Sequence, residues 1–191
     1  MQIVIGIAGA HSTGKSSFCK ALSDTLTTIG IRVALVPSFG KTAYNLGMPL
    51  LKKHDYSSTL WFINKTSEER KKAMINSEVI IVDRPEFDAL AYWNAAMDFR
   101  KESHIIKEKE SIEKIIIEHS QCYSYLFATK LDSLIPLAPD RDCDLDFRKS
   151  VDFHLHDLKT RMPFIFSTLK SNQHQETIFK LHSEITLKLG K

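Results

Sequence analysis

The apolar residues of this chain follow two patterns that alternate along its length. Short runs rich in isoleucine and valine, such as Ile3–Ala8, are typical of strands buried in a parallel sheet. Longer segments with apolar residues three or four positions apart predict helices between these runs. Strands are predicted at residues 3–8, 31–37, 79–83, 123–131 and 162–166. Helices are predicted around residues 18–29, 57–76, 85–97, 101–119, 144–158 and 177–189.

Residues 38–56 interrupt this alternation and are predicted to be irregular. They combine glycine, proline and lysine, and they follow the carboxyl end of the second predicted strand. Because ligands bind at that edge of a doubly wound sheet, this segment is a candidate wall of a substrate site. A solvated connection between two elements is the alternative.

Composition fits one domain in a reducing compartment. The chain has 191 residues, 43% of them hydrophobic and 26% charged, so we expect a single domain over residues 1–191. The formal net charge of +3 permits an anionic ligand without requiring a nucleic-acid surface. The 3 cysteines share no metal-binding or redox spacing. No apolar stretch is long enough to span a membrane, so we expect a cytoplasmic protein.

The strongest motif is Gly9-Ala10-His11-Ser12-Thr13-Gly14-Lys15-Ser16, which matches the phosphate-binding pattern G-x-x-x-x-G-K-[ST] at every required position. Its glycines let successive backbone N–H groups face an anion, and the next helix adds the positive end of its dipole. Lys15 would reach the β- and γ-phosphates, and the Ser16 hydroxyl would bind Mg²⁺. A glycine-rich turn with a chance lysine is the alternative. The predicted nucleotide-binding residues are Gly9, His11, Ser12, Thr13, Gly14, Lys15, Ser16 and Ser17, with His11 expected at the surface.

Charged residues follow the third predicted strand. Asp83 ends this strand, where a carboxylate can hold Mg²⁺ directly or through water. Arg84 comes next, and its guanidinium suits a phosphate or an oxygen-rich sugar. Asp88 lies four residues further on, in a helix that opens at Pro85. Asp83 is therefore a candidate metal ligand, and Arg84 and Asp88 are candidate substrate-binding residues. The alternatives are a chance acid at a strand end and a surface salt bridge between Arg84 and Asp88.

A proline-marked segment at residues 132–148 is predicted to form a lid. Asp144 can cap the helix that follows, which places Arg141 just outside this helix and Arg148 one turn within it. Two arginines there could close over a triphosphate and neutralise charge during phosphoryl transfer. The nearby aspartates leave open that both arginines balance local charge instead. The residues predicted to face inward from this helix are Phe147, Val151, Leu155 and Leu158.

With these motifs in place, the chain resembles the P-loop kinases of the group that includes the ribosylnicotinamide kinase domain of NadR and related small AAA ATPases. The deoxynucleoside and thymidylate kinases are more distant relatives. The resemblance runs over nearly the whole chain, from the loop at residues 9–16 to the strand at residues 163–166. It implies a three-layer α/β fold with a mostly parallel five-stranded sheet between helices and an arginine-bearing lid. It also implies ATP and Mg²⁺ as cofactors.

The resemblance implies that the chain transfers the γ-phosphoryl group of ATP to a small acceptor. Lys15 and Mg²⁺ would stabilise the bridging charge, and Arg141 and Arg148 would act at the transferred group. A hydroxyl acceptor must lose a proton, which Asp83 or Asp88 could accept. A phosphate acceptor needs no such base.

The acceptor itself stays open at this stage. Arg84 would position it, and Ser38 is a further substrate-binding candidate, because it stands where relatives of this kind usually carry an acid after the second strand. One hypothesis is a kinase for a nucleoside, a nucleotide or a related small hydroxyl-bearing molecule. A second is a kinase for a hydroxyl of DNA or RNA, or for a modified base in DNA, with Lys41, Lys52 and Lys53 in a basic groove. The third is a nucleotide-binding switch or regulatory ATPase.

Overall fold

The fold consists of alternating strands and helices, and the computed structural model describes it for residues 2–132 and 144–191. The elements of this described part, in chain order, are β1 (Ile3–Ala8), α1 (Lys15–Thr28), β2 (Val33–Val36), α2 (Gly40–Asn45), the 3-10 helix η1 (Leu51–Lys53), α3 (Tyr56–Met74), β3 (Val79–Asp83), α4 (Glu86–Arg100), α5 (Ile106–Ser120), β4 (Tyr125–Thr129), α6 (Leu145–Arg161), β5 (Ser167–Leu169), the 3-10 helix η2 (Ser171–Gln173) and α7 (His174–Leu189).

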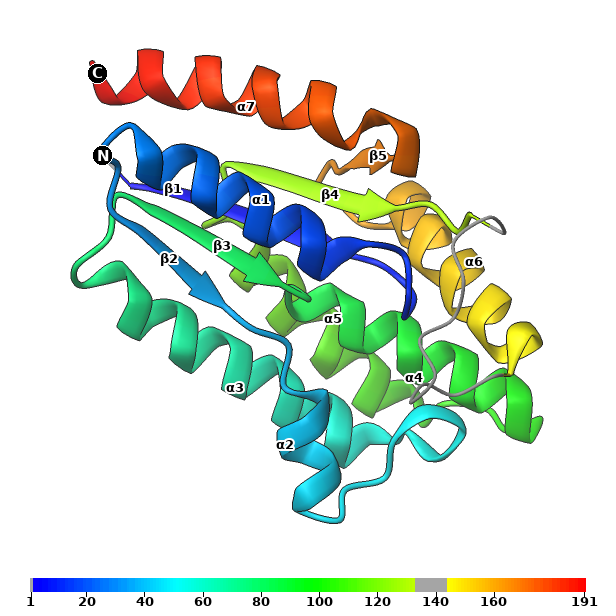
Figure 1. Cartoon of the computed structure of the whole chain (residues 1–191). Helices are drawn as coiled ribbons and strands as arrows, with labels where there is room; N and C mark the ends of the chain where they lie inside the picture. The colour runs from blue at the N-terminus through cyan, green and yellow to red at the C-terminus, as the bar shows by residue number, and fades with distance from the viewer. Residues whose placement is uncertain (1, 133–143) are drawn as a thin grey trace.

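The strands form one parallel five-stranded sheet in the order β2-β3-β1-β4-β5. β1 and β3 lie at its centre, and every residue of these two strands is buried. Helices α1 and α7 cover one face of the sheet, and α3, α4, α5 and α6 cover the other (Figure 1). This three-layer arrangement confirms the predicted fold class. Because Ile7 pairs with Asp83, the end of β3 lies beside the start of the phosphate loop.

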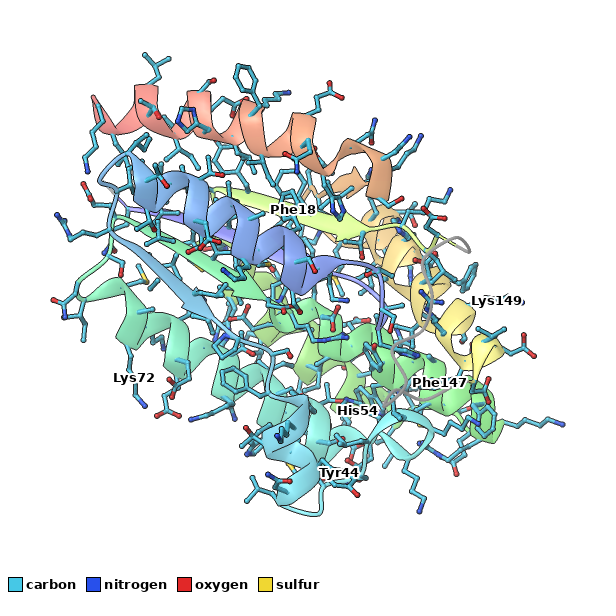
Figure 2. All side chains as sticks on the ribbon, in the orientation of Figure 1. Phe18, Tyr44, His54, Lys72, Phe147 and Lys149 are labelled. Carbon is cyan, nitrogen blue, oxygen red and sulfur yellow. The ribbon has the colours of Figure 1, made fainter. Side chains whose placement is uncertain are left out.

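Each face of the sheet has its own apolar core. On one face, Phe18 of α1 and Leu181 of α7 are buried against Ile5 of β1 (Figure 2). On the other face, Phe87 and Trp93 of α4 belong to a second buried cluster, which α3, α5 and α6 complete. Fully burying one such large side chain stabilises the fold by about 1.5–3 kcal/mol. The two cores therefore fix the sheet edge at which the strands end.

Two aspartates cap helices near this edge. The Asp144 side chain accepts hydrogen bonds from the backbone N–H groups of Asp146 and Phe147 at 3.0 and 2.8 Å, which confirms the predicted start of α6. Asp55 caps α3 through a reciprocal capping box with Ser58. The inward face predicted for α6 is also confirmed, since the structure buries Phe147, Val151, Leu155 and Leu158.

The last strand differs from the prediction. A strand at residues 162–166 is wrong, because β5 lies at Ser167–Leu169. These residues are irregular, and Phe164 and Phe166 pack on α4 instead. The rings of Phe164 and Phe166 lie 5.3 and 5.4 Å from the ring of Phe87. Aromatic side chains can be buried against a helix as well as in a sheet, so the apolar run alone did not determine the pairing.

The segment after β2 is more regular than predicted. Residues 38–56 contain α2 and η1, so the prediction of a wholly irregular segment is wrong. α2 has 6 residues, of which Ala43 alone is buried. A helix with one buried residue lacks the repeated apolar spacing on which sequence prediction depends.

Two further properties bear on the expected environment. None of the helices in residues 2–132 and 144–191 is long and apolar enough to cross a membrane. Cys19 and Cys122 both have free thiols. Burial raises the pKa of the Cys19 thiol well above its ordinary value and that of Cys122 to about 11, so both thiols stay protonated at neutral pH.

Candidate active site

The loop between β1 and α1 adopts a bend that depends on its glycines. Gly9 has a φ of 152°, Ser12 of 54° and Gly14 of 82°. At Gly9 a side chain is also excluded by space, because a Cβ would lie 1.8 Å from Oγ1 of Thr129. Gly14 is the N-cap residue of α1. The glycines thus bring the loop onto the amino terminus of α1, where backbone N–H groups favour an anion.

Thr129 supports the loop from the neighbouring strand β4. Its hydroxyl oxygen lies 2.6 Å from that of Thr13, and the Thr13 hydroxyl lies 3.0 Å from the carbonyl oxygen of Ala10, to which it donates. Thr13 and Thr129 are both buried. The Thr13 side chain therefore stabilises the conformation of the loop. Only the backbone of Thr13 is left as a candidate to bind the nucleotide.

Lys15 is the first residue of α1, and its side chain is buried against this loop. Its ammonium donates hydrogen bonds to the Ala10 carbonyl oxygen and, at 3.2 Å, to the Thr13 hydroxyl. Burial, followed by the positive charge of Arg84, lowers the pKa of Lys15 to about 7. A nearby polyphosphate would favour the charged form and raise this pKa again. The environment of Lys15 thus suits an anionic ligand.

Ser16 and Asp83 lie together at the ends of α1 and β3. The Ser16 hydroxyl donates to Oδ2 of Asp83 at 2.6 Å. The Asp83 carboxylate is buried, and its Oδ1 has no hydrogen-bond partner within the described residues. A buried oxygen without a partner is unfavourable unless a cation or water satisfies it.

The hydroxyl and carboxylate of this pair are oxygen donors of the kind that Mg²⁺ prefers, so the residues fit this ion. Across residues 2–132 and 144–191, no group of three or more His, Cys, Asp or Glu side chains could hold a metal ion. Mg²⁺ usually takes its further ligands from waters and substrate phosphates.

Arg84 and Asp88 form an ion pair in which Asp88 is buried and Arg84 is partly buried, not the surface salt bridge that their spacing allowed. The Arg84 guanidinium donates to Oδ2 of Asp88 at 2.5 Å and to the Gly9 carbonyl oxygen at 3.1 Å. Oδ1 of Asp88 accepts the Gly9 N–H at 2.8 Å. Burial opposes the charge on Arg84, but Asp88, Tyr92 and Asp83 together outweigh burial and raise the Arg84 pKa. The pair therefore fixes both backbone polar groups of the first loop glycine.

The backbone of Arg84 has an unusual conformation. Its φ is 74°, which costs on the order of 1–3 kcal/mol in a residue other than glycine. The Arg84 N–H donates to the Ile7 carbonyl oxygen at 3.0 Å, so the strand pairing maintains this conformation. The guanidinium lies 5.0 Å from the centre of the Tyr92 ring. Arg84 is thus held in a fixed position beside the loop.

Arg148 reaches the phosphate loop from α6. Its Nε donates to the His11 carbonyl oxygen at 3.0 Å, and its Nη2 donates to the Ser12 carbonyl oxygen at 2.8 Å. His11 is only 4% exposed, so the expected surface position is wrong. The reason is the return of α6 to the loop, a contact between distant parts of the sequence. Arg141 and most of the predicted lid lie outside the described residues.

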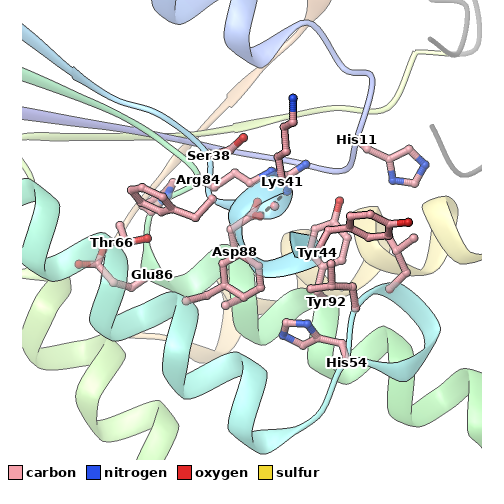
Figure 3. Close-up of a pocket in the computed structure, with 17 residues that line it drawn as sticks. His11, Ser38, Lys41, Tyr44, His54, Thr66, Arg84, Glu86, Asp88 and Tyr92 are labelled. Carbon is pink, nitrogen blue, oxygen red and sulfur yellow. Dashed lines mark hydrogen bonds and ion pairs between the residues drawn. The ribbon is translucent and has the colours of Figure 1, made fainter. Parts of the chain in front are cut away.

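A cavity of about 550 Å³ opens beside the loop (Figure 3). The candidate wall at residues 38–56 forms one side, and α3, α4, the connection from β3 to α4 and His11 form the rest. All three substrate-binding candidates, Ser38, Arg84 and Asp88, line it. Figure 3 shows His54 across the cavity from Ser38. The aromatic wall of the cavity consists of Phe39, Tyr44, Phe62 and Tyr92.

Glu86 also lines this cavity, and the sequence did not indicate it. Its carboxylate accepts hydrogen bonds from Arg70 at 2.8 Å and from the Tyr123 hydroxyl at 2.6 Å. Burial opposes the ionisation of Glu86, but His119, Arg70 and Tyr123 outweigh burial and lower its pKa. The negative charge is therefore already balanced by neighbouring residues.

Sequence reasoning missed Thr129, Glu86 and His54. Thr129 lies within the strand predicted at residues 123–131, so its position beside the loop could have been found only once the order of the sheet was known. Glu86 follows Pro85 and is typical of an acid in the first turn of any helix. His54 belongs to no motif, and the sequence offers no signal for it.

Comparison with known proteins agrees with this geometry. A family model described as "AAA domain" matches residues 4–176. No curated protein sequence matches the chain significantly. The chain is similar to the crystal structure of thymidylate kinase from Ehrlichia chaffeensis, with a TM-score of 0.64 and 19% identity, over 94% of this chain and 98% of that one.

The chain is also similar to the NadR protein in complex with NR. The TM-score is 0.70 at 9% identity, over 95% of this chain and 51% of that one, so the chain spans about half of the NadR chain. Identities this low show the fold, while substrate and reaction depend on the residues of the site.

Proposed function

The chain belongs to the AAA domain family, and on that basis we propose that it is a kinase that uses ATP and Mg²⁺. Its acceptor would be a nucleoside, a nucleotide or a related small hydroxyl-bearing molecule. The observation that most supports this proposal is the cavity of about 550 Å³ beside the phosphate loop. Hydrolysis of ATP requires only water, whereas a cavity of this size with an aromatic wall suits a small organic acceptor.

The nucleotide would bind along the loop at residues 9–17. Backbone N–H groups at the start of α1 would face the phosphates, and the Lys15 ammonium would pair with the β- and γ-phosphates. Ser16 and Asp83 would hold Mg²⁺, which supplies charge neutralisation to the phosphates when bound. The burial of Lys15 and the unpartnered Oδ1 of Asp83 support these roles.

The acceptor would bind between this loop and the wall at residues 38–56. The fixed guanidinium of Arg84 would orient it, and Ser38 on the same cavity would contact it. Asp88 already accepts two hydrogen bonds, from Gly9 and Arg84, so its role would be to hold these groups. If the acceptor is a hydroxyl, Asp88 would also be the candidate to take its proton, because it lines the cavity and the proposed Mg²⁺ ligand Asp83 does not.

The two arginines predicted to act at the transferred group would have different roles. Arg148 binds two carbonyl oxygens of the loop, so we assign it to holding the loop in its phosphate-binding shape. Arg141 lies outside the described residues, and its action at the transferred group remains a prediction.

Transfer of labelled γ-phosphate from ATP to a panel of nucleosides, nucleotides and DNA tests the proposal. We expect at least one small acceptor to be labelled, with Mg²⁺ required and with Lys15→Ala inactive. ATP turnover that no acceptor accelerates would contradict a kinase and indicate a regulatory ATPase. Labelling of DNA alone would contradict a small acceptor.

A further inference from the structure

His54 lies on the cavity wall between η1 and α3, and its position is fixed. It is only 3% exposed. The Arg100 guanidinium donates to the carbonyl oxygens of Lys52 and His54 at 2.6 and 3.1 Å. The residue that follows, Asp55, is the N-cap of α3. The imidazole is therefore held between two constrained segments of backbone.

The surroundings of the imidazole are aromatic. Its centre lies 5.7 Å from that of the Phe62 ring and 6.4 Å from that of the Tyr92 ring, and both rings also line the cavity. Burial, partly offset by Asp55 and reinforced by Arg100, lowers the pKa of His54 to about 4. At neutral pH the ring is thus uncharged, with one N–H donor and one acceptor nitrogen.

One nitrogen of this ring has no partner. Nε2 of His54 is buried without a hydrogen bond to any described residue. A buried nitrogen of this kind is unfavourable unless a ligand or water satisfies it. It belongs to a cavity-lining side chain that is more than nine-tenths buried, which indicates a polar ligand rather than open solvent.

The charged groups that are buried along the same cavity already have partners. Glu86 is paired with Arg70 and Tyr123, and Arg84 is paired with Asp88. A charged ligand group next to His54 would lose its hydration against aromatic side chains without gaining a counter-ion. The His54 end of the cavity therefore favours an uncharged group.

We propose that this end of the cavity is a subsite for an uncharged heteroaromatic ring of the acceptor, with Phe62 and Tyr92 as its apolar wall and the His54 imidazole as a hydrogen-bonding partner of the ring's polar edge. His54 is then a residue that determines specificity. This inference rests on the proposed function, because the ring belongs to the molecule that receives the phosphoryl group.

Calorimetric binding of matched ligands to the whole chain tests the subsite. The probes are adenosine, guanosine, cytidine, thymidine and phenyl riboside, whose ring has no polar edge. The wild type should bind at least one nucleoside about tenfold more tightly than phenyl riboside. In His54→Phe this preference should fall to about twofold or less, and His54→Asn should restore part of it.

His104→Phe is the matched control. His104 packs 4.3 Å from the Trp93 ring and also has a pKa lowered to about 4 by burial, but it does not line the cavity. It should keep the wild-type preference. A wild type that binds phenyl riboside as tightly as every nucleoside would overturn the proposal, and so would an unchanged preference in His54→Phe. If His54→Phe does not fold, the wild type is compared with His54→Asn alone. The preference of His54→Asn should then be smaller than that of the wild type, and an equal preference would overturn the proposal.

Phosphoryl transfer, measured separately, distinguishes this inference from the function on which it rests. A preference that depends on His54 without any transfer would support the subsite and contradict the kinase. Transfer to nucleosides with no effect of His54 would support the kinase and contradict the subsite.

Discussion

Replacing Arg148 by alanine removes the hydrogen bonds from α6 to the phosphate loop. The guanidinium donates to the carbonyl oxygens of His11 and Ser12 at 3.0 and 2.8 Å. Ser12 has a φ of 54°, so the loop adopts a strained conformation at the point where Arg148 binds it. Without the guanidinium, we expect the loop to leave its phosphate-binding shape more often.

The magnitude follows from these two hydrogen bonds. A hydrogen bond to a charged group contributes about 1.5–3 kcal/mol, and water would satisfy part of both carbonyls in the variant, so we expect a loss of about 2 kcal/mol. This corresponds to nucleotide binding that is about 30-fold weaker, with kcat reduced by no more than about threefold. An arginine that acts mainly on the transferred group would instead lower kcat by about a hundredfold and leave binding unchanged.

The assay combines calorimetric binding of a non-hydrolysable ATP analogue with steady-state turnover. Lys149→Ala is the matched control, because Lys149 is the next residue and its 3.3 Å ion pair with Asp146 is exposed. Its binding should change by less than about twofold. Arg148→Lys keeps the charge but loses the fork of donors, so it should lie between alanine and the wild type. A large fall in kcat with unchanged binding would refute the loop-holding role.

Other residues of the site lead to four further expectations. Lys15→Ala should abolish turnover and keep the wild-type circular dichroism spectrum, and unimpaired turnover would contradict its role. Phosphates bind the protonated Lys15 amine, whose pKa is about 7 in the free protein, so ATP affinity should fall as pH rises above about 7. Binding should also take up protons, which calorimetry in buffers of different ionisation enthalpy measures. An affinity independent of pH would refute this. Asp83→Asn should raise the Mg²⁺ concentration for half-maximal turnover by at least about tenfold, and a wild-type Mg²⁺ dependence would exclude Asp83 as a ligand. Asp88→Ala leaves the partly buried Arg84 guanidinium without its carboxylate and the Gly9 N–H without its acceptor, and it should lower the free energy of unfolding in urea by about 3 kcal/mol. Lys20→Ala, which breaks an exposed ion pair, should cost less than about 1 kcal/mol, and equal losses would contradict the burial argument.

The phosphate end of the site could be predicted because it depends on local sequence. The motif at residues 9–16 predicts the backbone conformation of the loop from these residues alone. The β-branched run before Asp83 indicates a buried parallel strand. Parallel strands end at one edge of the sheet, so the ends of β1 and β3 lie close together. The Ser16 hydroxyl and Oδ2 of Asp83 are therefore 2.6 Å apart. Asp144 could be predicted as a helix cap for the same reason, since capping involves only neighbouring residues.

The long-range contacts around the site could not be predicted, because they depend on packing between distant segments. Arg148 contacts a residue 137 positions away, and no spacing along the chain encodes that contact. Glu86 meets Arg70 and Tyr123 only after α3, α4 and β4 have assembled. The aromatic run at residues 162–166 could be buried in a sheet or on a helix, and only the assembled core decides between them.

The two ends of the site come from different stretches of the chain. Eight of the 17 residues that line the cavity lie between residues 38 and 54, and this stretch contributes nothing to the pairing of Ser16 with Asp83. Under the proposed function, mutations in this stretch should change acceptor binding without changing nucleotide binding. Grafting the corresponding stretch from another member of the family is therefore a practical route to new acceptor preferences.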